Sequence, residues 1–141
     1  MLHVPSSERQ FIMYEALRKG ATVDELFELT KIKHYFIQQM KELVEEEESL
    51  MQYKGEVPPV EVLRQAKLDG FADKYLSELL GVTEEEIRDA RTKEGIVEGW
   101  EGVHVSATPD SAYYFSSYHI KDQSPCSDNK KIMILGGGPN R

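Results

Sequence analysis

The sequence has 141 residues, of which 40% are hydrophobic and 30% are charged, so it can form one domain of ordinary size or two very small ones. Its formal net charge of −8 repels phosphate backbones and anionic lipid, which argues against binding to nucleic acid or to a membrane surface. No apolar run approaches the roughly 20 residues that a bilayer span requires, and residues 1–5 lack the features of a signal peptide. The single cysteine, Cys126, cannot form an internal disulfide or a multi-cysteine metal site. We therefore expect a cytoplasmic protein.

The chain resembles itself when it is shifted by 50 positions, and no gap is needed. The matching residues of the two copies are Ala16, Gly20, Leu26, Glu28, Leu29, Ile32 and Ile37, which align with Ala66, Gly70, Leu76, Glu78, Leu79, Val82 and Ile87. Each copy has the pattern of a helix, a glycine, a short helix, a turn and another helix. We therefore predict an all-α fold, a small bundle of two helical repeats over residues 7–51 and 59–94, within a helical domain of residues 1–95.

Three helices are predicted in the first repeat. The first ends at Gly20, because glycine tolerates the left-handed conformation that closes a helix. Thr22 and Glu25 have the spacing of a capping box for a second helix over 23–30. The third helix is predicted over 33–50, and its apolar stripe can serve a core or an interface. This stripe consists of Phe36, Met40 and Leu43, widened by Ile37 and Val44.

Four consecutive glutamates, Glu45 to Glu48, lie late in the third helix. The helix dipole favours cations at this end, so the run costs a little stability. Two interpretations are open, a solvated helix face and a docking patch for a basic partner. The docking patch would make the chain a free-standing acidic helical adaptor, which is the first alternative function.

The second repeat is predicted to contain helices over 59–68, 73–80 and 83–93. The last of them has a capping box formed by Thr83 and Glu86. A linker over 54–59 ends in two prolines, which suit a bend followed by a helix start.

Part of this repeat, residues 71–88, has the rhythm of a helix-turn-helix, which makes a DNA-binding regulator the second alternative. In a DNA reader, the first turn of the second helix enters the major groove. Here that turn carries three glutamates over 84–86, whose charges repel DNA. We interpret the pattern as helix packing and predict no nucleic-acid partner.

Residues 96–129 have a different composition, with glycines, prolines and serines that prevent long helices. The apolar residues of this stretch are Trp100, Val103, Val105, Tyr113, Tyr114, Phe115 and Tyr118. A connection of this length without regular structure is uncommon in a compact domain. We predict an extended aromatic-rich tail that lies over a surface, either of the helical body or of a neighbouring domain.

The last residues, 130–141, begin with the apolar run Ile132 to Leu135 and continue into Gly136, Gly137 and Gly138. An apolar strand that runs into glycines is how many α/β nucleotide-binding domains begin. We therefore expect this segment to be the first strand and loop of a further α/β domain, and the chain to be a piece of a longer protein.

No catalytic, cofactor-binding or metal-binding residue is assigned within the chain. The four histidines, His3, His34, His104 and His119, have no metal-ligand spacing on one helix. His34 is expected to be a packed or half-exposed structural residue. The sequence contains no nucleophile elbow, Walker loop, HExxH motif or EF-hand loop.

These segments together resemble the large subunit of carbamoyl phosphate synthetase, in the order of that family and over nearly the whole chain. The first helical unit of the family is similar to Ala16-Leu17-Arg18-Lys19-Gly20, Leu29-Thr30-Lys31-Ile32 and Phe36. Its second unit is similar to Leu63-Arg64-Gln65-Ala66-Lys67, Gly70-Phe71-Ala72-Asp73 and Ile87-Arg88. Its aromatic-serine segment is similar to residues 113–118, and the opening of its second synthetase half is similar to residues 131–141. One stretch departs, because residues 103–108 replace the usual Val-Asp-Thr-Cys-Ala-Ala-Glu-Phe and the connection is shorter.

The resemblance implies a role within a larger enzyme. The chain would be the non-catalytic oligomerisation domain that joins two ATP-grasp halves of one polypeptide and self-associates. The parent would be a ligase that makes carbamoyl phosphate from bicarbonate, glutamine-derived ammonia and two ATP, for pyrimidine and arginine synthesis. It would use ATP and Mg²⁺ and a glutaminase small subunit. Residues 136–141 would correspond to the loop that opens the second half, which should bind nothing without its sheet.

Overall fold

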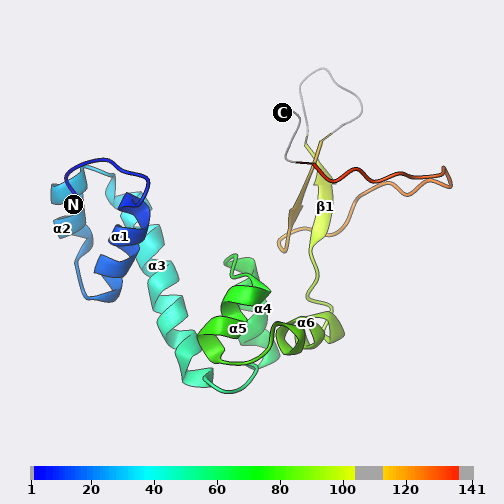
Figure 1. The fold of residues 1–141 in the computed structure, drawn as a ribbon, viewed down its shortest axis with the longest axis horizontal. Helices are drawn as coiled ribbons and strands as arrows, with labels where there is room; N and C mark the ends of the chain where they lie inside the picture. The colour runs from blue at the N-terminus through cyan, green and yellow to red at the C-terminus, as the bar shows by residue number, and fades with distance from the viewer. Residues whose placement is uncertain (1, 104–112, 137–141) are drawn as a thin grey trace. The chain divides into compact units, whose positions relative to one another are not determined.

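A computed structural model describes residues 2–103 and 113–136. The chain forms two compact units, residues 1–97 and 98–141, which are described separately. In the parts described, the first unit is built from α-helices and one short 3-10 helix, and the second contains a two-stranded sheet (Figure 1). None of the helices described is long and apolar enough to cross a membrane. The predicted departure over 103–108 falls, apart from Val103, outside the described residues.

The first repeat contains α1 (Arg9–Arg18), α2 (Val23–Thr30) and α3 (His34–Leu50). The predicted capping box is present, because the backbone nitrogen of Glu25 donates to the Thr22 hydroxyl at 3.2 Å and the Thr22 nitrogen donates to the Glu25 carboxylate at 2.8 Å. The helices α1 and α2 both pack against α3. The buried core of this repeat consists of Met13, Leu17, Leu26, Ile37 and Val44.

A short 3-10 helix, η1 (Met51–Tyr53), leads into the second repeat, which contains α4 (Val60–Leu68), α5 (Asp73–Leu80) and α6 (Glu84–Lys93). Here α4 and α5 pack against α6. The predicted capping box of Thr83 and Glu86 is also present. Core residues recur 50 positions apart, so the internal similarity of the sequence corresponds to equivalent packing. The buried pairs are Met13 and Leu63, Leu26 and Leu76, and Ile37 and Ile87.

The apolar stripe predicted on α3 divides between core and surface. Ile37 and Val44 are buried, whereas Phe36 is 58% exposed and Leu43 is 37% exposed. Ile37 and Val44, which were predicted only to widen the stripe, therefore form part of the core. Phe36 and Leu43 are exposed at the surface, where a partner can reach them.

The prediction of an all-α fold with an extended tail holds in part, because the structure described is mostly helical but the second unit contains a two-stranded sheet. Two strands, β1 (Gly99–Gly102) and β2 (Tyr114–Ser117), pair antiparallel with Gly99 opposite Ser117 and Gly102 opposite Tyr114. A side chain at Gly99 would place its Cβ 2.7 Å from the backbone nitrogen of Asp122, so only glycine lets the following chain pass this close. The glycines that prevent a helix here therefore permit a hairpin.

Residues 130–136 contain neither a helix nor a strand in the structure. The side chains from Ile132 to Leu135 are 84–89% exposed. The strand predicted for this run thus has no pairing partner within the part of the chain that the structure describes. The glycine loop that follows lies, from residue 137, outside the described residues.

Candidate functional site

One buried carboxylate joins the two helical repeats. Glu47, near the end of α3, is only 4% exposed. It accepts hydrogen bonds from the hydroxyls of Tyr14 at 2.8 Å and Tyr75 at 2.7 Å, and it forms an ion pair with Arg18. Tyr14 and Arg18 belong to α1 and Tyr75 belongs to α5, so both repeats supply donors to the same group. Three donors satisfy a buried charge that would otherwise be costly.

The two tyrosines of this cluster are neutral donors at physiological pH. Burial raises the pKa of Tyr75 to about 12, and its hydrogen bond to Glu47 acts in the same direction. The same two causes raise the pKa of Tyr14. Since neither phenol titrates near neutrality, the cluster is suited to holding structure and not to proton transfer.

A second charged cluster lies inside the second repeat. The carboxylate of Asp73 accepts from the Lys67 ammonium at 2.6 Å and from Nε of Arg91 at 2.7 Å. Lys67 also donates to the carbonyl of Phe71 at 2.7 Å, and Arg91 donates to the carbonyl of Ile96 at 3.1 Å. The cluster therefore ties together the end of α4, the start of α5, α6 and the chain that leaves the helical unit.

Opposing influences set the ionisation of Asp73. Burial acts to raise its pKa, but the hydrogen bonds and charges of Lys67 and Arg91 outweigh burial and hold the pKa below its usual value. Asp73 is therefore ionised at neutral pH. Lys67, whose side chain is 4% exposed, depends on this carboxylate to balance its charge.

The glutamate run on α3 does not form a single acidic face. Glu47 is buried in the junction, and Glu45 pairs with Lys41 at 3.5 Å. Partial burial raises the pKa of Glu46, with the charge of Asp69 acting in the same direction. The docking patch for a basic partner, the alternative to a solvated helix face, is thus reduced to the exposed Glu45 and Glu48, which weakens the adaptor interpretation.

The helix-turn-helix interpretation meets a similar difficulty. The helices α5 and α6 have the expected spacing, but the first turn of α6 consists of Glu84, Glu85 and Glu86. The Glu86 carboxylate caps its own helix, and Glu84 pairs with Arg88 at 3.1 Å. These groups stabilise the helix start, where the dipole favours anions, and they would repel a phosphate backbone.

His34 makes two side-chain contacts with residues of α2. The ring of His34 stacks on Phe27 with centroids 4.2 Å apart, and its Nε2 lies 3.0 Å from an Asp24 oxygen. Across the described ranges, no group of three or more histidine, cysteine or acidic residues could hold a metal ion. His104 lies outside these ranges.

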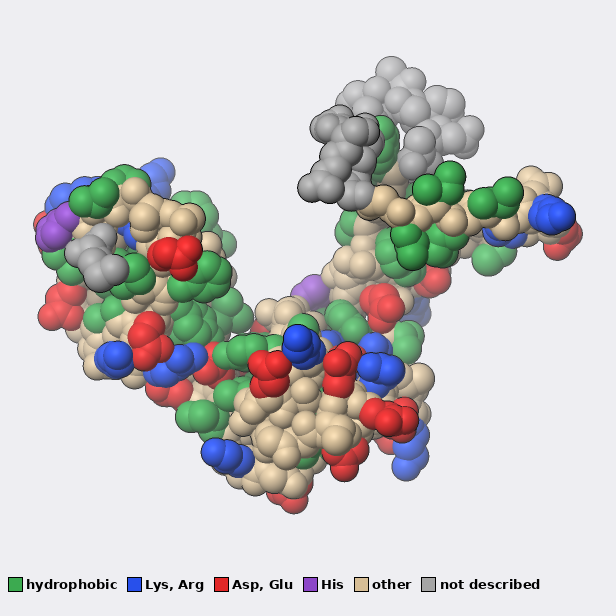
Figure 2. Space-filling model, viewed as in Figure 1, with side chains coloured by type: hydrophobic (Ala, Val, Ile, Leu, Met, Phe, Trp, Pro, Cys, Tyr) green, Lys and Arg blue, Asp and Glu red, His purple; other side chains and the backbone are tan. Residues whose placement is uncertain are grey.

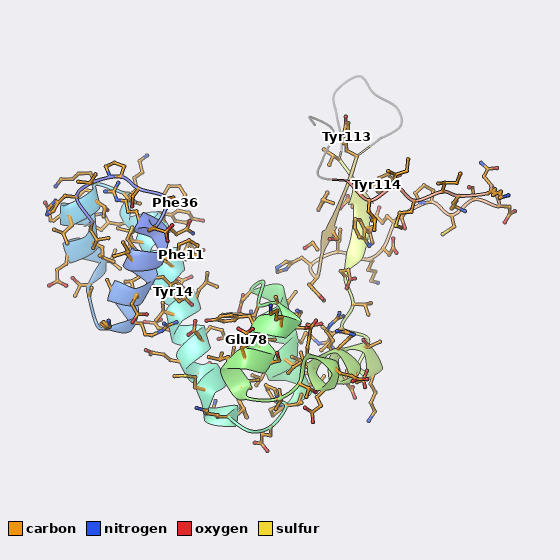
Figure 3. The ribbon with its side chains drawn as sticks, in the orientation of Figure 1. Phe11, Tyr14, Phe36, Glu78, Tyr113 and Tyr114 are labelled. Atoms are coloured by element: carbon orange, nitrogen blue, oxygen red, sulfur yellow. The ribbon has the colours of Figure 1, made fainter. Side chains whose placement is uncertain are left out.

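Exposed apolar side chains gather on the first repeat. Phe11 on α1 is 69% exposed, and Tyr35 and Phe36 at the start of α3 are 67% and 58% exposed. Beside Phe36 lies a groove of about 410 Å³, with Met13, Ile32 and Met40 in its lining. Figure 2 shows hydrophobic side chains on this part of the surface, and Figure 3 labels Phe11 and Phe36. An apolar surface of this kind is typical of a protein interface.

The hairpin unit also exposes aromatic side chains. Trp100, Tyr114 and Phe115 are 42–44% exposed, and Tyr113 is 64% exposed. Figure 3 labels Tyr113 and Tyr114. A two-stranded hairpin is marginal by itself and usually packs against a further element. The exposed apolar side chains of this unit are thus typical of a segment that packs against another surface.

Comparison with known families decides what kind of domain this is. Residues 1–95 match the family described as carbamoyl-phosphate synthetase large chain, oligomerisation domain. The chain belongs to this family. The matched residues include all six α-helices described above, both capping boxes and the Glu47 cluster.

Relatives of this oligomerisation domain are found in archaea, bacteria and plants. The chain is 41% identical over 145 residues to a carbamoyl phosphate synthase large chain of Methanosarcina barkeri, and 39% identical over 143 residues to that of Pseudomonas aeruginosa. It is 38% identical over 143 residues to the carbamoyl phosphate synthase arginine-specific large chain, chloroplastic, of Arabidopsis thaliana. These alignments cover 99–100% of this chain but only 12–13% of the relatives, so the chain spans about an eighth of their length.

Sequence reasoning did not find the Glu47 cluster. A signal for it was present, because Glu47 follows Ile37 and Val44 at helical spacing and so continues their buried face. The glutamate run concealed this signal, since four like residues suggest one solvated face. The partners Tyr14 and Tyr75 lie on other helices, and nothing local to Glu47 indicates them.

Proposed function

We propose that the chain is the non-catalytic connecting and oligomerisation domain of a carbamoyl phosphate synthetase large subunit. It joins the two ATP-grasp halves of the polypeptide, holds their relative placement and offers a surface for self-association. The observation that carries the proposal is the match of residues 1–95 to the oligomerisation-domain family. The relatives support it, because a stretch within each of these large chains aligns with 99–100% of this chain.

The parent protein is, on this proposal, a cytoplasmic ATP-dependent ligase. It makes carbamoyl phosphate from bicarbonate, ammonia released by a glutaminase small subunit, and two ATP, for pyrimidine and arginine synthesis. ATP and Mg²⁺ belong to the ATP-grasp halves, and this chain contributes no catalytic, cofactor or metal residue. Measurable ATP hydrolysis by the purified chain would overturn this division of roles.

The segments of the chain have separate tasks in this proposal. Residues 1–95 form the oligomerisation domain, residues 96–129 connect it to the next half, and residues 130–141 supply the first strand and loop of that half. Two observations support the last two assignments. The hairpin aromatics and the run from Ile132 to Leu135 are exposed, and large exposed apolar segments are typical of surfaces that another domain covers.

A chimeric enzyme tests the connecting role. The 143 aligned residues of the Pseudomonas aeruginosa large chain are replaced by this chain, and carbamoyl phosphate synthesis is measured with the small subunit and glutamine. We expect the chimera to retain synthesis within about tenfold of the parent enzyme. The matched control carries a flexible glycine-serine linker of equal length, which should abolish synthesis. A folded chimera that is no better than the linker control would contradict the proposal.

A further inference from the structure

The two helical repeats have few principal contacts with each other. Within each repeat, two helices pack against a third. The main contacts that link the two repeats are those of the short helix η1 with α3 and with α5. The linker adds one backbone hydrogen bond, from Gly55 to the carbonyl of Leu80 at 2.7 Å. The angle between the repeats therefore depends on a small junction at the end of α3.

The Glu47 cluster is the polar part of this junction. Tyr14 and Arg18 approach the carboxylate from α1, and Tyr75 approaches it from α5. Glu47 lies on α3, the helix that runs from the first repeat to the junction. If the second repeat swings away, Glu47 loses the Tyr75 donor and opens to water.

The internal similarity of the chain shows that this cluster is not part of the repeat architecture. The positions 50 residues away are Arg64 for Tyr14, Leu68 for Arg18, Val97 for Glu47 and Glu25 for Tyr75. None of the four residue types recurs, although the apolar core residues do. The second repeat thus folds without an equivalent of this cluster, and the hydrogen bond from Tyr75 to Glu47 is the contact of the cluster that crosses between the repeats.

We propose that Glu47 is a latch that fixes the angle between the two helical repeats. Its buried carboxylate at the junction accepts hydrogen bonds from α1 of the first repeat and from α5 of the second, and so holds the two repeats together. The latch concerns the geometry of residues 1–97 alone, so it stands or falls independently of the role in a synthetase.

Distance measurement between two spin labels tests the latch. The labels are placed on α2 and α6 through Glu28→Cys and Asp89→Cys, and Cys126→Ser removes the native thiol. Pulsed electron–electron double resonance should give a narrow distance distribution for the otherwise unchanged chain. We expect Glu47→Gln to at least double the width of this distribution, with helical circular dichroism unchanged. Glutamine lacks the charge and replaces one of the two acceptor oxygens with a nitrogen that cannot accept from these donors.

Two further variants make the outcome decisive. Tyr75→Phe removes only the α5 donor and leaves Glu47 paired with Arg18, so it should also broaden the distribution even where Glu47→Gln fails to fold. Glu48→Gln changes the exposed neighbour of Glu47 and should leave the distribution unchanged. The proposal is wrong if Tyr75→Phe gives the same distribution as Glu48→Gln.

Discussion

At the scale of single residues, the carboxylate of Asp73 is shared by two cations, the buried Lys67 and the partly buried Arg91. Removing one partner of a buried ion pair leaves an uncompensated charge, at a cost of about 3–5 kcal/mol. We expect Asp73→Asn to lower the free energy of unfolding by about this amount, as measured by urea denaturation. Asp89→Asn, at an exposed position of α6, is the control and should change it by less than about 0.5 kcal/mol.

The same carboxylate predicts how stability depends on acid. The pKa of Asp73 is lower in the folded chain than its ordinary value of 3.8. Its contribution is therefore present above pH 3.8 and is lost as the pH falls through the lower folded value. We expect Asp73→Asn to flatten the decline in stability below about pH 4 in urea titrations. An unchanged acid slope would show that Asp73 does not carry this dependence.

Burial and hydrogen bonds to Glu47 raise the pKa of Tyr14 and of Tyr75 above the ordinary value of 10.0. A raised tyrosine pKa contributes stability that is present below the ordinary value of 10.0 and is lost as the pH rises through the folded value, about 12 for Tyr75. Absorbance at about 295 nm should therefore show a late phase equivalent to two phenols, provided far-ultraviolet circular dichroism shows that the chain is still folded. Glu47→Gln should move this phase to lower pH, whereas Glu48→Gln should not.

At the scale of elements, the two repeats end their second helix differently. The residue after α5 is Gly81 with φ 73°, and the equivalent residue after α2 is Lys31 with φ 58°. Lysine pays a conformational cost there, and its side chain pairs with Glu28 at 2.6 Å and lies over the Phe27 ring. Gly81 has no side chain to make such contacts, and the residue equivalent to Phe27 is Ser77, which has no ring.

This difference predicts that stability depends more on glycine at position 81, after α5, than at the equivalent position 31, after α2. We expect Gly81→Ala to lower the melting temperature, at a cost of about 1–2 kcal/mol, because alanine is disfavoured at positive φ. The reverse comparison, Lys31→Gly, should cost less than Gly81→Ala, since the relief of backbone strain offsets the loss of an exposed ion pair. Equal destabilisation by the two changes would count against this account of the helix ends.

Sequence reasoning succeeded for elements that are specified locally. The bounds of α2 and α5 agree with the prediction because local signals mark both helices. A capping box begins α2, and α5 lies between Gly70 and Gly81. The hairpin was missed, since Trp100 and Ser116 pair across a long separation that local pattern does not reveal. The split of the α3 stripe into Ile37 inside and Phe36 outside depends on where α1 and α2 pack, which one helix cannot indicate by itself.

At the scale of the whole molecule, two opposing forces act on self-association: attraction between apolar surfaces and repulsion between like-charged copies. The exposed Phe11, Tyr35 and Phe36 favour contact between copies, whereas the formal charge of −8 on each copy opposes it. Salt screens the repulsion between copies and leaves the apolar contact largely intact. Association through this surface should therefore strengthen as the salt concentration rises, which is the opposite of association through ion pairs.

Sedimentation equilibrium at low and high salt measures this balance. We expect the chain to form dimers or larger assemblies at high micromolar concentration, with a dissociation constant that falls between 50 mM and 500 mM salt. The double change Phe11→Ser and Phe36→Ser should weaken association by at least tenfold, since it removes the apolar side chains that are already exposed in one copy. Tyr113→Ser, in the hairpin unit, is the control and should leave it unchanged. A strictly monomeric parent chain would mean that this surface is insufficient by itself, and that the neighbouring halves must contribute to the interface.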